Sequence, residues 1–264
     1  MRRRGFLGLA TSALTAGALL RPMRAAGSMH GADEQMSSLE SFGLQLSTVT
    51  ALMLKDFAGT LARVAEIGYR QVEFSAMGFL GRPVEQIEAL LAQNGLAAPV
   101  GRVTPRLPEG FAELPRDEAM RVYRSRAGLE NLSDNVKYSL EIALAMGQKY
   151  LNLPYLGPDQ FATLDLVKAT IERLVEAGET CAREGVLFGY HNHDWELRPV
   201  DGVVPYELML SDTNKDLLAF QMDAYWIVKA GGDLHDLLTR HAGRFPSVHL
   251  KDIDATGDFE DVGY

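Results

Sequence analysis

Residues 186–196 read VLFGYHNHDWE, an apolar, β-rich run that leads directly into a cluster of imidazole, amide, indole and carboxylate side chains. The same arrangement returns further along the chain in residues 218–226 (LAFQMDAYW) and residues 247–252 (SVHLKD). Near-continuous apolar runs are typical of parallel strands that are buried on both faces. Polar groups directly after such strands are typical of (β/α) barrels, whose catalytic residues collect where strands end and helices begin.

The rest of the chain repeats this alternation of strands and helices. Four segments have apolar residues at helical spacing, and a glycine follows each of them: 57–67, 84–93, 129–146 and 164–183. Glycine just past the last turn is a common helix end, because it adopts a left-handed backbone without a Cβ clash. Seven short β-rich runs are predicted as strands: 42–50, 70–75, 97–103, 149–153, 186–193, 218–226 and 247–251.

Strands that alternate with helices predict an α/β fold with a parallel sheet. The glycine turns at 101–103 and 231–233 lack the strand, GxGxxG and helix context of a dinucleotide-binding site, so a barrel is favoured over a doubly wound sheet. We therefore predict a (β/α)8 TIM barrel over residues 41–264. Only seven strands are found in the sequence, so we expect the barrel to be C-terminally incomplete, with its eighth strand missing.

The N-terminus has the features of an export signal. Residues 1–26 contain five arginines and no acidic residue, and Arg3-Arg4 precedes a modest apolar stretch that ends in small residues. This pattern predicts a twin-arginine signal peptide and a periplasmic mature protein, although a frayed basic tail is the alternative. Residues 27–40 are polar and aperiodic, and are predicted to be a linker.

Charge and cysteine content limit the class of partner. The chain carries a net charge of −9, and removal of residues 1–26 leaves 21 basic against 35 acidic side chains, or −14. Such a surface repels phosphate backbones, so we expect no nucleic-acid partner and instead a small molecule. The one cysteine, Cys181, has no neighbours that favour its thiolate and is predicted to be inert packing.

The polar strand ends predict a metal site. An aspartate after a strand is often only a helix cap, and a lone histidine often has a structural role, so Asp223, His191, His193 and His249 are each weak signals alone. Together they follow neighbouring strands, whose carboxyl ends meet at the barrel mouth. Carboxylate and imidazole groups that converge there can bind a divalent ion.

The motifs YHNHDWE, FQMDAYW and HLKD, in this order, resemble the xylose-isomerase-like TIM barrel superfamily. More narrowly, they resemble its bacterial sugar phosphate isomerase/epimerase group, and the resemblance covers residues 42–264. It implies a divalent metal (Mn, Mg, Zn or Co) bound by Glu196, Asp223 and His249, with His191 or His193 as alternatives to Glu196. It also implies a fourth ligand from an eighth strand; Glu260 lies in a predicted polar turn, too early for that role.

The resemblance further implies a sugar isomerase or epimerase that acts through an enediolate on a small carbohydrate. In this interpretation the catalytic groups are His191, His193 and Lys251. Substrate would be bound by Glu73, Trp195 and Tyr225, with Trp226 as a further stacking surface, although solvated or core roles are open for these residues. The alternatives are a 3-keto-glycoside lyase or hydrolase, an inosose dehydratase-like enzyme, and a non-catalytic sugar-binding barrel. A nuclease is disfavoured by the acidity, and no membrane contact is expected after signal removal.

Overall fold

The structure, a computed structural model, describes residues 42–75, 78–108, 110–111, 114–260 and 262. Leu39–Tyr264 forms one compact unit. The other unit, Met1–Ser38, lies outside the described residues, and so do the predicted signal peptide 1–26 and the predicted linker 27–40. Within the part that the structure describes, no helix is long and apolar enough to cross a membrane.

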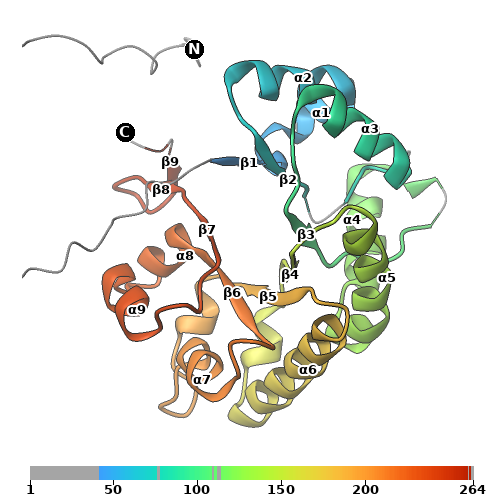
Figure 1. Cartoon of the computed structure of the whole chain (residues 1–264). Coiled ribbons are helices and arrows are strands. Elements are labelled where there is room, and N and C mark those ends of the chain that lie inside the picture. The colour runs from blue at the N-terminus through green and yellow to red at the C-terminus, as the bar shows by residue number, and fades with distance from the viewer. Residues whose placement is uncertain (1–41, 76–77, 109, 112–113, 261, 263–264) are drawn as a thin grey trace, which may run out of the picture. The chain divides into compact units, whose positions relative to one another are not determined.

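Seven parallel strands, one within each predicted range, form two curled sheets (Figure 1). The first sheet pairs β1 (Gly43–Gln45) with β2 (Gln71–Glu73). The second runs in chain order through five strands: β3 (Val100–Arg102), β4 (Tyr150–Leu153), β5 (Leu187–His191), β6 (Ala219–Asp223) and β7 (Ser247–His249). Chain order with parallel pairing confirms the predicted α/β barrel type.

The curl is not closed. One isolated parallel bridge, between Gln71 and Ala97, connects the two sheets. β1 pairs only with β2, and β7 only with β6, among the described residues. The chain then forms an antiparallel hairpin of β8 (Asp252–Ile253) and β9 (Phe259–Glu260) in place of an eighth parallel strand. The fold is thus an incomplete (β/α) barrel, and the prediction of a turn at Glu260 is wrong, because that residue lies in β9.

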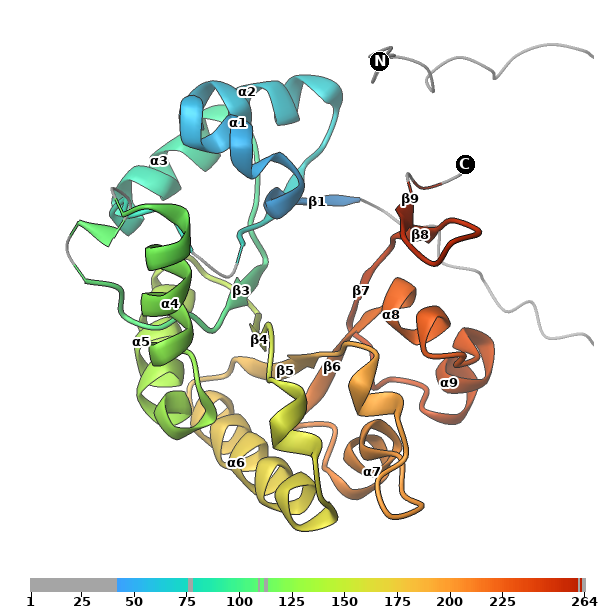
Figure 2. The same cartoon turned by 180° about the vertical axis from the view of Figure 1, so that it is seen from behind.

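The four predicted helices are present as α2 (Phe57–Ile67), α3 (Val84–Asn94), α5 (Leu132–Ala145) and α6 (Leu164–Ala182). Gly68 (φ 118°) and Gly95 (φ 62°) end α2 and α3 in the left-handed conformation expected of them. The described residues form five further α-helices that were not predicted from the sequence: α1 (Thr50–Lys55), α4 (Arg116–Arg126), α7 (Pro205–Asp212), α8 (Ala224–Lys229) and α9 (Leu234–Arg240). The helices lie on the outside of the curl, as the view from behind also shows (Figure 2).

All seven strands are shorter than predicted, and two of the predicted ranges, 42–50 and 218–226, are helical at their carboxyl ends. Residues 46–49 form a 3-10 helix that leads into α1. The run 218–226 ends its strand at Asp223, whose side chain caps α8, so Tyr225 and Trp226 are helical. A capping side chain supplies an acceptor for the free N–H groups of a first helical turn, and so ends the extended conformation.

The strands of the second sheet separate apolar from polar side chains. Leu151, Phe188 and Phe220 are fully buried and belong to the core cluster that also contains residues of α5, α6 and α7. The alternate residues are polar: Arg102 of β3 donates a hydrogen bond to Gln221 of β6 at 2.8 Å. Side chains of strands that are three places apart in the sheet meet in this way only inside the curl. The interior beneath the barrel mouth is therefore polar.

Candidate active site

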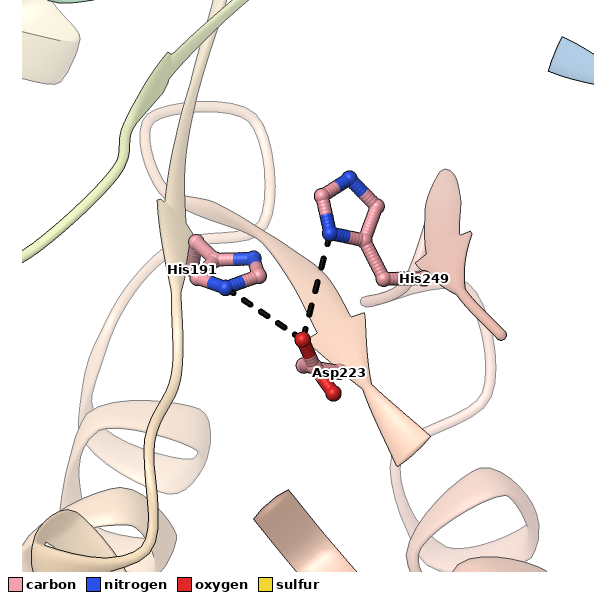
Figure 3. A group of neighbouring side chains, drawn as sticks. All are labelled: His191, Asp223 and His249. Carbon is pink, nitrogen blue, oxygen red and sulfur yellow. Dashed lines mark ion pairs between the residues drawn. The ribbon is translucent and has the colours of Figure 1, made fainter. Parts of the chain in front are cut away.

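Three side chains that suit a metal ion meet at the mouth of the curl. His191, Asp223 and His249 are each the last residue of a strand, namely β5, β6 and β7. Asp223 Oδ2 lies 3.5 Å from His191 Nε2 and 3.9 Å from His249 Nδ1 (Figure 3). One ligand atom from each residue lies within 4.8 Å of the others. Parallel neighbouring strands that end at the same level produce this convergence.

The burial of Asp223 and the neutral state of His191 suit the binding of a cation. Asp223 is fully buried, and its other carboxylate oxygen, Oδ1, caps α8 by accepting from Trp226 N at 3.5 Å. Burial, with the nearby charge of Arg102, lowers the pKa of His191 well below its ordinary value, so this imidazole is neutral at pH 7. Lys251 Nζ forms an ion pair with Asp223 Oδ2, the oxygen that both imidazoles face.

This donor set fits a divalent metal. Neutral imidazole nitrogens and a carboxylate oxygen are the ligands that Zn, Co and Mn commonly take in proteins. The ammonium group on Asp223 shows that the same oxygen already stabilises a positive charge in this chain. Deprotonated or neutral donor groups are required for binding, and His191 meets that condition.

Glu196 lies apart from these three residues. Its carboxylate is fully buried, where it accepts hydrogen bonds from the Tyr190 hydroxyl and, at 2.9 Å, from His193 N. Burial raises the pKa of Glu196 to about 7, against the opposing effect of the bond from Tyr190. The structure thus brings Asp223 and His249 together as predicted, and places His191 with them where the resemblance implied Glu196.

His193 lies beside His191, Asp223 and His249, which we call the ligand group, and belongs to a cluster of aromatic rings. Its ring stacks on Trp195, with centroids 4.6 Å apart and planes inclined by 4°. Tyr155 meets both rings edge-on, at 5.2 and 5.5 Å, and Trp226 lies 5.4 Å from His193. We call these four residues the aromatic platform. Burial lowers the pKa of His193 to about 4, so its imidazole is neutral at pH 7.

The hydroxyl group and the ring of Tyr225 both contact other residues of the protein. Its hydroxyl donates to Gly257 O at 2.9 Å and accepts from Lys229 Nζ at 2.7 Å, and its ring packs on Phe259 of β9 at 3.9 Å. Tyr225 therefore holds the β8–β9 hairpin against α8. Lys251 lies beneath this hairpin, with Nζ 5.2 Å from the centre of the Phe259 ring.

Glu73 lies inside the curl, below the ligand group, with 9% of its surface exposed. Its carboxylate pairs with Arg102 Nη1 at 3.0 Å, accepts from Gln221 Nε2 at 2.6 Å, and faces His249 Nε2 at 3.1 Å. Burial alone would raise the pKa of Glu73, but the charge of Arg102 and the bond from His249 lower it below its ordinary value.

Three further polar residues of the site were not predicted from the sequence: Asn192, Arg102 and Gln221. Asn192 is fully buried and binds the backbone of the next strand, since its Oδ1 accepts from Asp223 N at 2.9 Å. Arg102 and Gln221 complete the polar interior with Glu73. A signal for Gln221 was present, because a polar residue stands at the centre of the apolar run AFQMD. Tyr155 of the aromatic platform follows β4 in the same way that the predicted residues follow their strands.

Residues 61–263 match the family described as Xylose isomerase-like TIM barrel. Two crystal structures of a sugar phosphate isomerase/epimerase from Parabacteroides distasonis are similar to this chain. One is 23% identical, with a TM-score of 0.66, over 83% of this chain and 79% of that chain. The other is 25% identical, with a TM-score of 0.67, over 80% and 78%.

A D-allulose 3-epimerase from Methylomonas sp. has the same fold at 13% identity, with a TM-score of 0.56 over 83% of this chain and 77% of that chain. No curated protein matches the sequence.

Proposed function

Because this chain belongs to the xylose isomerase-like TIM barrel family, we propose that it is a metal-dependent isomerase or epimerase of a sugar or sugar derivative, acting through an enediolate. The observation that carries the proposal is the convergence of His191, Asp223 and His249, whose ligand atoms lie within 4.8 Å of one another. The similarity to a sugar phosphate isomerase/epimerase supports the reaction class.

Asp223, His191 and His249 would hold the ion, with His191 in the place of Glu196, the fifth-strand ligand that the resemblance implies. A divalent ion supplies Lewis acidity at the sugar carbonyl and fixes the orientation of the neighbouring hydroxyl. Asp223 provides the only carboxylate of the three, and its burial keeps water from competing for it.

Proton transfer is assigned to residues beside this group. His193 is neutral at pH 7 and is the member of the aromatic platform that lies beside the ligands, with its ring centre 5.2 Å from that of His191. A neutral imidazole there accepts the proton from the carbon next to the carbonyl and returns it to the enediolate. Lys251, whose side chain is 34% exposed, donates to the substrate oxygen that gains charge.

The aromatic platform is proposed to bind the C–H face of the sugar. Tyr155 is half exposed, and its ring stands against His193 and Trp195. Rings of this kind supply apolar contact together with a polar edge. The two cations nearest to the ligands, Arg102 and Lys251, are each paired with a carboxylate, which favours a neutral sugar over a phosphorylated one.

A preference for a neutral sugar supports a second candidate, a lyase or hydrolase of 3-keto-glycosides or a dehydratase of inososes, which would use the same enolate chemistry.

A preference for a neutral sugar also agrees with export of the protein, which we propose from residues 1–26. Replacement of Arg3 and Arg4 by lysine is expected to retain the precursor in the cytoplasm. Cell fractionation measures where the variant accumulates. Normal export of the variant would exclude the twin-arginine route.

Hydrogen exchange with solvent tests the shared chemistry of these enzymes. The metal-stripped protein is incubated in D2O with Mn²⁺ and with free ketoses, aldoses, sugar phosphates, inososes and 3-keto-glycosides, and proton NMR follows the carbon-bound hydrogen next to the carbonyl. We expect exchange that requires Mn²⁺, with product signals that identify the reaction. Sugar binding with no exchange for any compound would instead identify a non-catalytic sugar-binding barrel.

Asp223→Asn is the matched test of the metal site, and Asp233→Asn is its control. Both aspartates cap a helix, since Asp233 Oδ1 accepts from Asp236 N at 3.1 Å in the first turn of α9, and asparagine caps helices about as well. Only Asp223 faces the two histidines. We expect Asp223→Asn to abolish both Mn²⁺ binding and exchange, and Asp233→Asn to retain both. Full activity of Asp223→Asn would refute the proposal.

A further inference from the structure

We propose that Glu73 is a positioning residue that fixes which ring nitrogen of His249 faces Asp223. His249 lies between two carboxylates: its Nε2 is 3.1 and 3.3 Å from the oxygens of Glu73, and its Nδ1 is 3.9 Å from Asp223 Oδ2. The inference rests on the proposed function only in one respect, namely that the nitrogen left free is the one offered to a metal.

The distances decide the position of the ring hydrogen. A neutral imidazole carries one N–H, and its other nitrogen has a lone pair. A separation of 3.1 Å permits a hydrogen bond, whereas 3.9 Å does not. In the neutral ring of His249 the hydrogen therefore lies on Nε2, directed at Glu73. The lone pair of Nδ1 then faces the same oxygen of Asp223 as His191 Nε2 does, at 3.5 Å from that oxygen.

Glu73 can act as a fixed acceptor because the interior of the curl holds its carboxylate from several strands. Arg102 of β3 pairs with it at 3.0 Å, and Gln221 of β6 donates to it at 2.6 Å. Gln221 is itself oriented, since its Oε1 accepts from Arg102 at 2.8 Å and its Nε2 donates to Ser247 Oγ at 2.9 Å. The position of the carboxylate is thus determined by side chains of β3, β6 and β7.

Stability alone does not account for this arrangement. Barrel interiors are commonly filled by layers of branched apolar side chains. A buried ion pair is often no more stabilising than apolar residues of similar volume, because both charges lose their hydration. The side chains of Arg102 and Glu73 are only 8% and 11% exposed. Carboxylates that accept from the second nitrogen of a ligating histidine are a recurrent way to set its tautomer and orientation.

The test uses the metal-free protein, so that it does not depend on the metal site. Nitrogen-15 chemical shifts and long-range ¹H–¹⁵N correlations of the imidazole rings report the tautomer of each histidine, and His249→Gln identifies the signals of His249. We expect the Nε2–H tautomer for His249 in the wild-type protein. The Nδ1–H tautomer would overturn the inference.

The double variant Glu73→Leu/Arg102→Met removes the acceptor without leaving a buried unpaired charge. We expect His249 to shift toward the Nδ1–H tautomer in it, because Asp223 becomes the only carboxylate facing the ring. Arg102→Met alone keeps the bond between Glu73 and His249 and is expected to retain the Nε2–H tautomer. Should the double variant not fold, Glu73→Met/Arg102→Met, which has no oxygen to accept the ring hydrogen and leaves no unpaired charge, is measured in its place. An unchanged tautomer in the variant that lacks the carboxylate would contradict the inference.

Calorimetric titration with Mn²⁺ gives a second readout. The double variant is expected to bind Mn²⁺ about 10- to 100-fold more weakly than the wild-type protein, the usual effect of losing such a partner. Equal affinity would show that Glu73 does not position a ligand. Failure of the wild-type protein to bind any divalent metal would refute the proposed function, while the tautomer measurements would still decide the role of Glu73.

Discussion

Lys251 and Asp223 form an ion pair at the mouth of the curl, on the same carboxylate oxygen that His191 Nε2 and His249 Nδ1 face. One oxygen therefore has three neighbours, of which one is a cation and the other two are potential ligands of a cation. A metal ion that binds Asp223 must share this oxygen with the ammonium group or displace it. Lys251 and the metal are accordingly expected to compete.

Lys251→Met is expected to tighten Mn²⁺ binding while it lowers the rate of exchange. Two like charges a few ångström apart repel, and because Lys251 is one third exposed, solvent screening reduces the effect to roughly tenfold in the dissociation constant. The loss of a hydrogen-bond donor to the substrate oxygen lowers turnover. Titration calorimetry and the D2O assay measure the two effects separately.

Lys229→Met is the control for charge. Lys229 also lies near the mouth, over the rings of Tyr225 and Trp226, but it binds the Tyr225 hydroxyl and no residue of the ligand group. Its removal is expected to leave the Mn²⁺ affinity unchanged. Equal tightening in both variants would mean that net charge matters and that the contact between Lys251 and Asp223 does not.

Asn192→Ala is expected to lower the free energy of unfolding by about 1–3 kcal/mol, because it leaves the buried N–H of Asp223 without its acceptor. Mn²⁺ affinity should also fall, since Asn192 connects the end of β5 to the end of β6. Urea unfolding and calorimetry test these outcomes. Asn131→Ala, which removes only a surface bond to Glu130, is expected to stay within about 0.5 kcal/mol of the wild-type protein.

The sequence predicted the strands better than it predicted their ends. All seven parallel strands lie within the expected ranges, because apolar runs and the glycines that close the preceding helices mark them clearly. Helix α8 was missed because AYWIVK is as apolar and aromatic as a strand, and only the Asp223 cap turns it into helix. The short helices α7 and α9 each span about two turns and offer too few residues to show a period.

The site was predictable where its residues end strands that pair in one sheet, and unpredictable where it depends on a turn or on a contact between the two sheets. Asp223 and His249 are register partners in β6 and β7, so adjacent strands bring them together. The choice between His191 and Glu196 depends on a 3-10 turn at Trp195–Leu197, which directs Glu196 to Tyr190. Arg102 and Glu73 belong to two different sheets, and no local pattern in the sequence encodes the ion pair between them.

Cys181 is expected to be unreactive in the folded protein. Its side chain is fully buried in α6, and burial raises the pKa of its thiol to about 12, against the weaker opposing effect of Arg183. The reactive thiolate is therefore scarce at pH 8. Labelling with a thiol reagent should be slow at pH 8 and become fast in urea. Ser133→Cys in a Cys181→Ala background, which places a thiol on the exposed face of α5, should label at once.

The two tryptophans of the chain, Trp195 and Trp226, both belong to the aromatic platform, so intrinsic fluorescence reports directly on this surface. We expect a substrate sugar to change the emission intensity. Tyr155→Ala should weaken sugar binding, roughly tenfold or less, by the loss of one stacking contact. Tyr69→Ala, on the distant α2–β2 connection, should have no effect. Binding that is unaltered in Tyr155→Ala would exclude the platform as the sugar site.

The raised pKa of Glu196 should make the stability of the protein depend on pH. This dependence also tests whether Glu196 or His191 is the metal ligand that follows from the fifth strand. The pKa of Glu196 in the folded protein is about 7, above its ordinary value of 4.5, because burial disfavours the charged form. Its stabilising contribution is therefore complete below pH 4.5 and is lost as the pH rises through 7, by about 3 kcal/mol in total. In the metal-free protein, the free energy of unfolding should fall by most of that amount from pH 5 to pH 8, relative to Glu196→Gln.

The same measurement with saturating Mn²⁺ separates the two candidate ligands. An ion bound to Glu196 would stabilise the carboxylate and depress its pKa, so the fall in stability between pH 5 and pH 8 would disappear. An ion held by His191, Asp223 and His249 without Glu196 would leave that fall in place. We expect the second result, because Tyr190 and the backbone of His193 already occupy both oxygens of Glu196. Loss of the pH dependence in the presence of Mn²⁺ would assign the ligand to Glu196.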